Sequence, residues 1–311
     1  MNPALEASKT NADDLTSYEK FIRLKEKVIE SLLFLAALFS ITITLGIFGI
    51  LVYESLAFFS HVSLIEFLTD TLWTPLFSPP RFGILPLVTG TLVTTAVALI
   101  VALPIGSVVA IYLSEFSPRV VREVLKPVLE LLSAVPTVVY GYFALLFVSP
   151  LLQKIVPDLP TFNMLSAGIV MGIMIIPYVS SLSEDAMRAV PMSLRESSYA
   201  LGANRIITAL KVVYPAAFSG IVASYILAIS RALGETMIVA IAAGMQPNLT
   251  LDPREPAATI TAFIVQVSLG DLPHGSIGYQ SIFAAGLTLF LMTLVFNVIG
   301  FYLKRKYREA Y

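Results

Sequence analysis

The chain of 311 residues has no cysteine, two histidines and one tryptophan, and charged residues make up only 13% of it. Without cysteine, neither a disulfide framework nor a thiolate metal site is possible. The scarcity of charge accompanies an apolar content of 57% and a mean hydropathy of +0.83, values that exclude an ordinary soluble globular domain. The composition predicts an all-α, polytopic membrane protein.

Two sequence motifs of common enzyme classes are missing. The sequence has no Gly-Lys-Ser/Thr phosphate loop, so this chain does not hydrolyse ATP by that route. It also lacks the His-Glu-x-x-His pattern of metalloproteases, and His61 and His274 fall in segments that we expect outside the membrane. We therefore expect no catalytic residue, no metal or cofactor bound by this chain, and no nucleic-acid partner.

Six apolar stretches are candidates to cross the hydrocarbon layer of a membrane, which needs about 20 helical residues. A polar tail, 1–27, precedes the first span, which we place at 28–58. An outer loop follows at 59–84, with an interfacial element around Ile65 to Trp73. The core, 85–303, holds the other five spans, predicted at Leu85–Leu113, Val128–Val148, Met164–Val179, Ala217–Ala243 and Ile282–Leu303.

The distribution of lysine and arginine orients these spans. Sixteen of the 20 basic residues lie in the tail, in the connections after the second and fourth spans, or in the basic C-terminal end, 304–311. Only Arg81, Lys154 and Arg254 fall on the opposite side, where Met245–Gln280 is predicted to be a long outer loop. Because basic residues favour the cytoplasmic side, both termini are predicted to be cytosolic.

The remaining basic residue, Arg231, lies within the fifth apolar stretch, four residues before Glu235. At that spacing the two side chains leave one face of a helix about a turn apart and can neutralise each other. A charged residue near the centre of a membrane helix costs roughly 2.5–3.5 kcal/mol and usually faces the interior of a bundle or a wet cavity. One interpretation is a salt bridge that only fixes helix packing. Because a guanidinium suits tetrahedral oxyanions and stays charged, we favour a pathway for a small anion.

Three further residues are candidates for that pathway. Ser230 is adjacent to Arg231, and Thr137 follows Pro136, whose missing N–H leaves a carbonyl free to line a cavity. Glu130, near the inner end of the third span, is either a pathway residue or an interfacial carboxylate that reaches water. In the fourth span, the Gly168-x-x-x-Gly172 spacing permits close helix approach and specifies no function.

The polar segment 180–211 is longer than a simple connection requires. Ser193 and Glu196 stand at the spacing of a capping box, which predicts a short helix that starts there and ends at Gly202 and Asn204. A short amphipathic helix parallel to the inner membrane surface would form a protruding contact surface for a cytosolic partner. The alternative is a helix that lies on lipid headgroups.

The same segment resembles the EAA motif of ABC importer permeases, which reads EAA, three residues, G, nine residues, I-x-L-P. Glu196, Gly202 and Pro215 match the motif, and Ser197 and Ser198 replace its two alanines without a change of spacing. The resemblance implies a MetI-like permease bundle with coupling to an ATPase. The residues that would carry this coupling are Glu196, Ser197, Ser198, Ala200, Gly202 and Pro215.

Two more stretches, Glu130 to Gly141 and Ser230 to Met237, resemble the signatures of high-affinity phosphate permeases. The first span, the cytosolic tail and the outer loop with Trp73 and Phe82-Gly83 make the chain more similar to the PstC type than to the sister PstA type. The likeness covers roughly residues 25–305. It implies a bacterial-type plasma membrane, a sister permease, two ATPase subunits that use ATP and Mg, and an external phosphate-binding protein. The inner helix would then dock in an ATPase groove, and closure of the nucleotide dimer would rock the bundle.

On this hypothesis Arg231 meets the anion released by the binding protein. Glu235 either accepts the proton that hydrogen phosphate carries and sulfate lacks, or neutralises Arg231 in the empty state. Two alternatives stay open at this point. Permeases for tungstate, molybdate or phosphonate share the architecture, and an ion-coupled secondary anion transporter also uses charges at the membrane midplane, although it has no need of the EAA-like segment.

Overall fold

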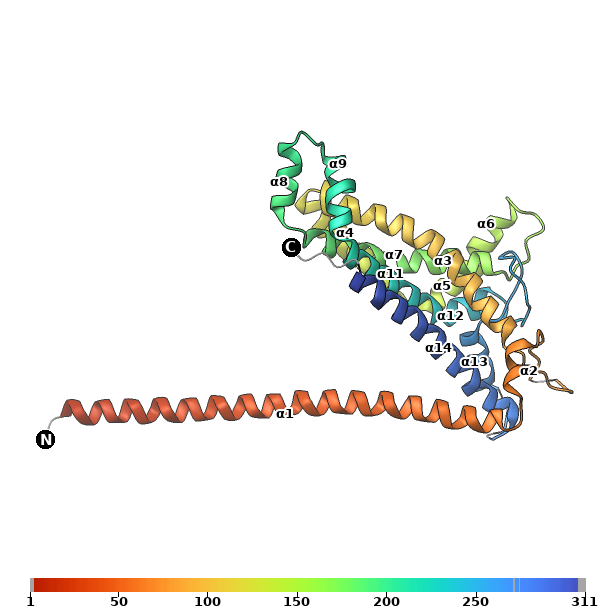
Figure 1. The fold of residues 1–311 in the computed structure, drawn as a ribbon, viewed down its shortest axis with the longest axis horizontal. Coiled ribbons are helices and arrows are strands. Elements are labelled where there is room, and N and C mark those ends of the chain that lie inside the picture. The colour runs from red at the N-terminus through yellow and green to blue at the C-terminus, as the bar shows by residue number, and fades with distance from the viewer. Residues whose placement is uncertain (1–2, 76, 271, 274, 307–311) are drawn as a thin grey trace. The chain divides into compact units, whose positions relative to one another are not determined.

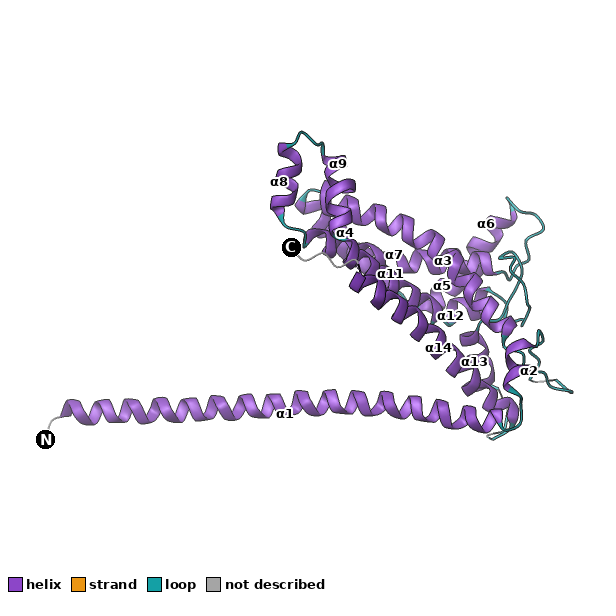
Figure 2. Ribbon diagram, viewed as in Figure 1, coloured by secondary structure: helices purple, strands orange, loops and turns teal. Residues whose placement is uncertain are grey.

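The structure is a computed structural model that describes residues 3–75, 77–270, 272–273 and 275–306, with side chains at residue 22 and from residue 24 onward. Asp271, His274 and Arg308, which we expected in the outer loop and at the basic end, lie outside the described residues, as do the side chains of most of the tail. The described residues form helices without a regular strand (Figure 2). Two isolated β-bridges, Trp73 with Phe82 and Gly244 with Ala257, are the exceptions in this part of the chain.

The chain divides into two compact units, Met1–Tyr53 and Glu54–Tyr311. The first unit belongs to helix α1 (Pro3–Phe59), which begins in the predicted tail. Within α1, Leu24–Phe59 is long and apolar enough to cross a membrane. This confirms the helix of the first predicted span, and the structure shows no break between that span and the described backbone of the tail.

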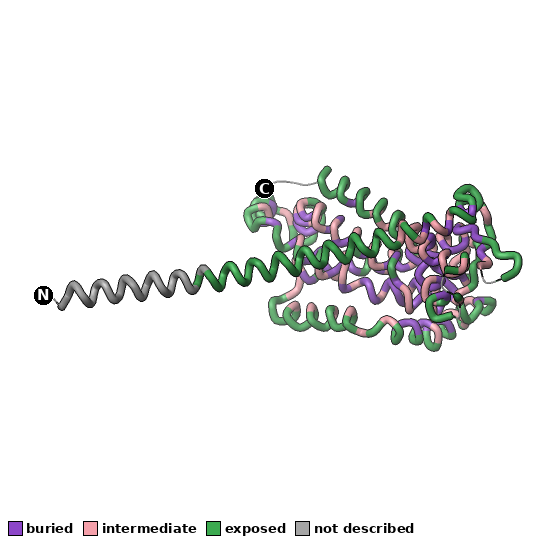
Figure 3. The backbone as a smooth tube through the Cα atoms, turned by 90° about the horizontal axis from the view of Figure 1, so that it is seen from below, coloured by how far each residue is buried: buried purple, intermediate pink, exposed green. Residues whose placement is uncertain are grey.

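The second unit is built on four long helices, α3 (Leu85–Ile111), α7 (Met164–Arg188), α11 (Phe218–Leu233) and α14 (Ile277–Lys306), which run beside one another (Figure 1). Their buried residues form the interior (Figure 3), which is rich in alanine and methionine, such as Ala98, Met171, Met174 and Ala228. Counting two bent helix pairs as one span each, the described residues contain six candidate spans. The predicted all-α, six-span architecture is confirmed.

Helices α3 and α7 form the closest pair because glycines lie at their contact. A Cβ atom added at Gly168 would lie 2.6 Å from Val97 Cβ, and one added at Gly172 would lie 2.7 Å from the Ala98 carbonyl oxygen. Both distances are too short for real carbon contacts, so a side chain at either position would force the helices apart. The close approach predicted for the glycine pair is confirmed.

The third span differs from its prediction as a single helix from Val128 to Val148. Helix α4 (Arg119–Ala134) meets α5 (Thr137–Phe143), a π-helical turn (Ala144–Val148) and α6 (Ser149–Gln153) at an angle of 86°. Val135 is extended before Pro136, since a proline disfavours the helical conformation of the residue before it. The predicted basic loop with Arg119, Arg122 and Lys126 is therefore helical and belongs to α4.

Three other predicted boundaries were wrong. Helix α7 continues past Val179 to Arg188, because Ser180, Ser183 and Glu184 are buried against the protein and do not end the span. The fifth span starts at Ala217 as predicted, where the chain bends by 72°, but it is interrupted by a break described below. The predicted outer loop Met245–Gln280 contains α13 (Ile260–Ser268) and the start of α14, which begins at Ile277.

The predicted outer loop at 59–84 contains a short helix and a cluster of packed aromatic rings. It contains α2 (Leu64–Thr69), and Trp73 is 1% exposed, with its ring edge-on to Phe67, Phe82 and Phe263. The Arg81 Nε donates to Asp70 Oδ2 at 2.7 Å across the loop. The aromatic residues therefore fasten this loop to α13, while Ile65 and Leu68 of the predicted interfacial element remain exposed.

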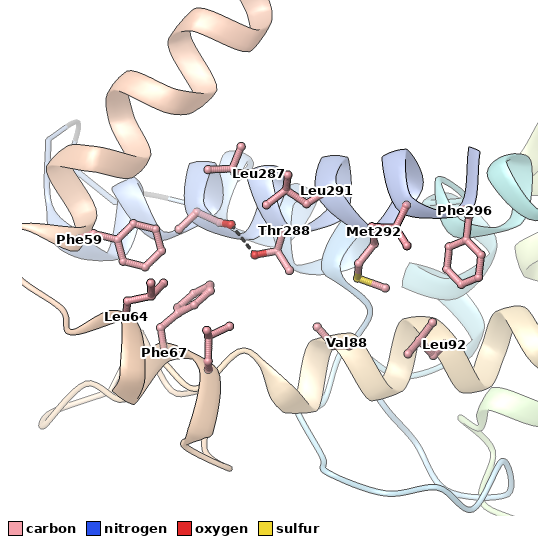
Figure 4. Close-up of a pocket in the computed structure, with 13 residues that line it drawn as sticks. Phe59, Leu64, Phe67, Val88, Leu92, Leu287, Thr288, Leu291, Met292 and Phe296 are labelled. Atoms are coloured by element: carbon pink, nitrogen blue, oxygen red, sulfur yellow. Dashed lines mark hydrogen bonds between the residues drawn. The ribbon is translucent and has the colours of Figure 1, made fainter. Parts of the chain in front are cut away.

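An apolar groove of about 540 Å³ lies between α3 and α14 (Figure 4). Val88 and Leu92 line one wall, Leu291 and Met292 line the other, and Phe67 of α2 lies at one end. The hydroxyl of Thr288, a polar side chain in the lining, donates to the Ala284 carbonyl oxygen at 2.9 Å. The lining of the groove contains no charged side chain and therefore offers nothing to attract an anion.

Candidate functional site

The charged pair lies at a break between α11, which ends at Leu233, and α12 (Met237–Ala242). Gly234, Glu235 and Thr236 connect the two helices. We expected Arg231 and Glu235 on one continuous helix, whereas Glu235 lies beyond the end of α11. The ion pair nevertheless forms, with Arg231 Nη1 3.3 Å from Glu235 Oε2. A broken span at such a position leaves backbone polar groups to be satisfied by other means.

Glu235 supplies one of those means. Its side chain is 2% exposed, and its Oε1 accepts hydrogen bonds from the backbone N–H of Met237 at 3.1 Å and of Ile238 at 3.5 Å. These donors belong to the first turn of α12, where a carboxylate is favourable. The carboxylate thus ties Arg231 to the start of α12 with both of its oxygens engaged.

The break is also held from outside the span. Thr261 of α13 donates from Oγ1 to the Glu235 carbonyl oxygen at 2.6 Å. The N–H of Ile260 in turn donates to Thr91 Oγ1 of α3 at 3.0 Å. Because these bonds fix the backbone on which Glu235 stands, the position of its carboxylate is set by three helices.

Arg231 itself remains partly open. Its side chain is 37% exposed, in contrast to the buried Glu235. Within the described part of the chain, the pair with Glu235 is its one hydrogen bond or ion pair. A guanidinium has five N–H donors, so most of them are available to an oxyanion.

The other predicted pathway residues, Ser230, Thr137 and Glu130, lie on three different helices. Ser230 lies next to Arg231 and donates to Asn297 Oδ1 of α14 at 3.3 Å. Thr137 is half-buried at the first position of α5. Glu130 is exposed on α4, where it accepts a weak hydrogen bond from Ser181 at 3.4 Å. No contact between Glu130 and Arg231 occurs among the described residues, and this favours the surface interpretation of Glu130.

The two broken spans meet directly beyond their breaks. A Cβ at Gly141 of α5 would lie 2.9 Å from Ile241 Cδ1 and 3.1 Å from the Met237 carbonyl oxygen of α12. The absence of a side chain at Gly141 therefore lets α5 and α12 touch. As a result, the segments that follow Pro136 and Glu235 belong to one packed layer, although about a hundred residues separate them in the sequence.

The predicted coupling helix is α8 (Met192–Ala200). Its start differs from the prediction: the N-terminal cap is Pro191, and Ser193 makes no capping hydrogen bond. Gly202 adopts a φ of +83°, which a glycine accommodates without strain, and ends the helix as predicted. Asn204 begins the next helix, α9 (Arg205–Thr208), by accepting from the Ile207 N–H at 2.9 Å.

The residues of the EAA-like segment divide into two faces. Glu196, Ser197, Ala200 and Gly202 are exposed. Ser198 is buried, and its hydroxyl lies 2.9 Å from that of Thr208 on α9. Pro215 is exposed in α10 (Tyr214–Ala216), at the turn into α11. Helices α8 and α9 lie together at one end of the second unit, at the opposite end from α2 (Figure 1).

The structure adds polar residues that sequence reasoning missed. Lys126 of α4 bonds to the buried Glu184 at 2.7 Å and to Asp185 at 2.6 Å on α7. Arg195 of α8 pairs with Glu115 at 2.8 Å. The sequence does contain a signal for these pairs, because a carboxylate inside or beside an apolar stretch, such as Glu184 or Glu115, needs a cation nearby. The sequence does not say which cation, because the partners are 58 and 80 residues apart.

A polytopic bundle with two broken spans, a charged pair at one break and an exposed helix at one end has the architecture of a membrane permease. Residues 102–309 match the family model described as "Binding-protein-dependent transport system inner membrane component". The chain belongs to this family of ABC importer permeases. It is accordingly a multi-pass inner-membrane protein and a non-catalytic transport subunit that binds no cofactor, and the ATPase partners of such permeases use ATP.

Individual relatives support the same assignment. The probable ABC transporter permease protein YqgH of Bacillus subtilis is 36% identical over 276 residues, which cover 89% of this chain and 88% of the relative. The phosphate transport system permease protein PstC of Mesorhizobium japonicum is 34% identical over 260 residues, which cover 76% of this chain and 77% of the relative.

Solved structures share the fold at lower identity. A chain of a bacterial ABC transporter involved in the import of the acidic polysaccharide alginate superposes with a TM-score of 0.63 at 17% identity, covering 92% of this chain and 100% of that one. A chain of the MetNI methionine ABC transporter, in inward-facing conformations, gives a TM-score of 0.53 at 16% identity, with coverage of 73% and 95%.

Proposed function

We propose that this chain is a permease subunit of an ATP-driven importer of inorganic phosphate. The observation that carries the proposal is the partly open Arg231 guanidinium at the break between α11 and α12. A permanently charged, planar donor at an interrupted span suits a tetrahedral oxyanion. The PstC relatives, with identities of about 30%, support phosphate as the anion.

In this account Glu235 acts mainly as an anchor for Arg231. Both of its carboxylate oxygens have partners, one the guanidinium and the other the amides of α12. Neither oxygen is left without a partner inside the protein. Neutralising Arg231 in the empty state is therefore the better supported of the two roles that the sequence left open for Glu235.

Transport also requires energy from outside the chain. We propose that the exposed face of α8, with Glu196, Ser197 and Ala200, docks on an ATPase subunit on the cytosolic side. ABC importer permeases assemble with ATPases and a binding protein, and here the partners would be a sister permease of the PstA type, two ATPase subunits and an external phosphate-binding protein. The excess of basic residues near α4, α8 and the C-terminal end supports a cytosolic location for that end of the bundle.

The substrate can be tested by ATPase stimulation. The complete complex in proteoliposomes would be given its binding protein with phosphate, sulfate, molybdate, tungstate or a phosphonate. We expect phosphate to stimulate ATP hydrolysis and to accumulate inside the vesicles. If only another oxyanion stimulates ATP hydrolysis, that oxyanion and not phosphate is the substrate. Uptake of phosphate without ATP hydrolysis would favour an ion-coupled transporter.

A further inference from the structure

Arg195 lies on the concealed face of α8, next to Glu196 of the EAA-like segment. It is 9% exposed, and all three of its guanidinium nitrogens donate hydrogen bonds. Nη1 donates to the Val190 carbonyl oxygen at 2.6 Å, and Nη2 donates to that of Met187 at 2.9 Å. Met187 lies in the last turn of α7, where helix carbonyls lack partners within the helix, and Val190 lies two residues past the end of α7. Arg195 therefore binds α8 to α7.

The same guanidinium holds a carboxylate on α3. Nη2 donates to Glu115 Oε1 at 2.8 Å and Nε donates to Glu115 Oε2 at 3.3 Å, a two-pronged contact. Glu115 is 6% exposed in a π-helical turn, Tyr112–Phe116, that continues α3. A buried ion pair is a weak source of stability, because removing both charges from water costs about as much as the pair returns. Its main effect is to fix one relative position of the helices that it joins.

The two helices that Arg195 binds are themselves tightly packed. A Cβ added at Gly106 would lie 2.7 Å from Val179 Cβ, near the same end of the α3–α7 pair. Such close packing transmits displacement without yielding. Arg195 thus joins α8 to a closely packed pair of helices.

Besides the hydrogen bonds of Arg195, α8 is connected to the bundle by the chain itself. It continues through α9 and α10 to Ala217, where the chain bends by 72° into α11, the helix that carries Arg231. Beyond the bend, α11 packs closely on α7, since a Cβ added at Gly220 would overlap the Ala186 Cβ and the Ser224 and Ser183 hydroxyls lie 2.7 Å apart. A displacement of α7 therefore also reaches α11.

We propose that Arg195 and Glu115 are positioning residues that clamp α8 to α3 and α7, so that a displacement imposed on α8 is passed to both of these helices. This inference rests on the proposed docking of α8 to an ATPase. It predicts that breaking the clamp uncouples ATP hydrolysis from transport while the complex still assembles.

The clamp can be measured without any substrate because the chain has no cysteine. Ser193→Cys on α8 and Val108→Cys on α3 are exposed sites for spin labels. In the complete complex, with and without trapped nucleotide, we expect the same inter-label distance in both states. With Glu115→Gln added, we expect the distance to differ between the states or its distribution to broaden.

The functional readout is phosphate moved per ATP hydrolysed. In Glu115→Gln and Arg195→Lys we expect this ratio to fall about fivefold or more, at the low end of typical coupling between sites. The control is Glu123→Gln, which makes the same charge change on an exposed carboxylate of α4. The ratio in that variant should match the native complex.

Two results would overturn the clamp. One is an unchanged label distance and an unchanged transport ratio in Glu115→Gln. The other is a loss of uptake and of ATP hydrolysis in equal proportion, which would mean that the pair only supports folding. If the native complex moves no phosphate, the proposed substrate fails, while the spin labels still decide whether α8 and α3 move together.

Discussion

The Glu235 carboxylate pairs with the Arg231 guanidinium at 3.3 Å although Glu235 lies beyond the end of α11, and its second oxygen caps α12. One buried acid thus serves two helices. The pair consequently links α11 to α12 and is also a candidate contact for the anion. Substitutions can separate these two roles.

Glutamine and alanine at Glu235 should differ. Glu235→Gln keeps an oxygen that can accept from Met237, whereas Glu235→Ala loses this cap, at a cost of about 0.5–2 kcal/mol. We expect thermal unfolding of the alanine variant to begin at a lower temperature than that of the glutamine variant. Equal unfolding temperatures would show that the cap contributes nothing.

The same glutamine variant tests anion selection. If Glu235 anchors Arg231, phosphate uptake by Glu235→Gln should fall while an excess of sulfate remains unable to compete. Competition by sulfate that appears only in the variant would instead support a proton-accepting role for Glu235. The measurement is uptake of labelled phosphate with and without sulfate.

Side chains at the helix-contact glycines should destabilise the bundle. Gly172→Val places atoms where the Ala98 carbonyl oxygen lies 2.7 Å from the new Cβ, and overpacking typically costs about 1–3 kcal/mol. The control is Gly234→Val, where the nearest atom to the added Cβ is the Ser230 carbonyl oxygen at 3.5 Å, an ordinary contact distance. Unfolding in detergent should begin earlier for Gly172→Val than for the control.

Lys126 should be more important than an ordinary surface lysine because it compensates the fully buried Glu184 at 2.7 Å. Removing one partner of a buried pair costs about 3–5 kcal/mol, and the 25% exposure of Lys126 reduces this to about 1–3 kcal/mol. Lys126→Met should therefore lower stability, and adding Glu184→Gln should restore part of it. No recovery in the double variant would argue against this account of the pair.

The outer loop should respond to acid through Asp70. The hydrogen bond from Arg81 lowers the pKa of Asp70 below its usual value of 3.8. A carboxyl whose pKa is lowered on folding stabilises the fold above its unfolded pKa and loses this effect as the pH falls through its folded pKa. The loop should thus be unaffected at neutral pH and loosen only below a pH of 3.8.

Trp73, the single tryptophan, reports on this loop. In the purified chain its fluorescence should stay constant from neutral pH down to about pH 4 and change below that, since Asp residues ordinarily titrate near pH 3.9. Arg81→Gln should move the change to higher pH, whereas Arg254→Gln, which breaks a different outer ion pair, should not. A transition that Arg81→Gln does not move would exclude Asp70 as its cause.

Much of the fold could be predicted because apolar length and basic residues determine which segments enter the membrane. The long helices α3 and α14 were found in this way. The break after α11 could not be, since Gly234-Glu235-Thr236 contains no proline and the helix ends there through contacts with Thr261 on α13. Helix α13 was itself assigned to a loop, because at nine residues it is too short to resemble a span.

The candidate site was predictable in part for a related reason. Arg231 and Glu235 are four residues apart, so local spacing alone indicates their pairing. Glu115 and Arg195 are 80 residues apart, and only the folded chain brings α8 to the turn that follows α3. The contact between Gly141 and α12 likewise depends on the breaks after Ala134 and Leu233, whose geometry the sequence does not specify.

The most direct test of the pathway is phosphate uptake by complexes that carry Arg231→Gln. The comparison is Arg254→Gln, which removes an exposed arginine of the outer surface. At equal amounts of assembled, ATP-hydrolysing complex, we predict that Arg231→Gln loses about 10-fold to 150-fold in uptake, the value of one hydrogen bond to a charged group. Uptake by Arg231→Gln equal to that of the Arg254→Gln control would contradict the assignment of Arg231 to the anion pathway.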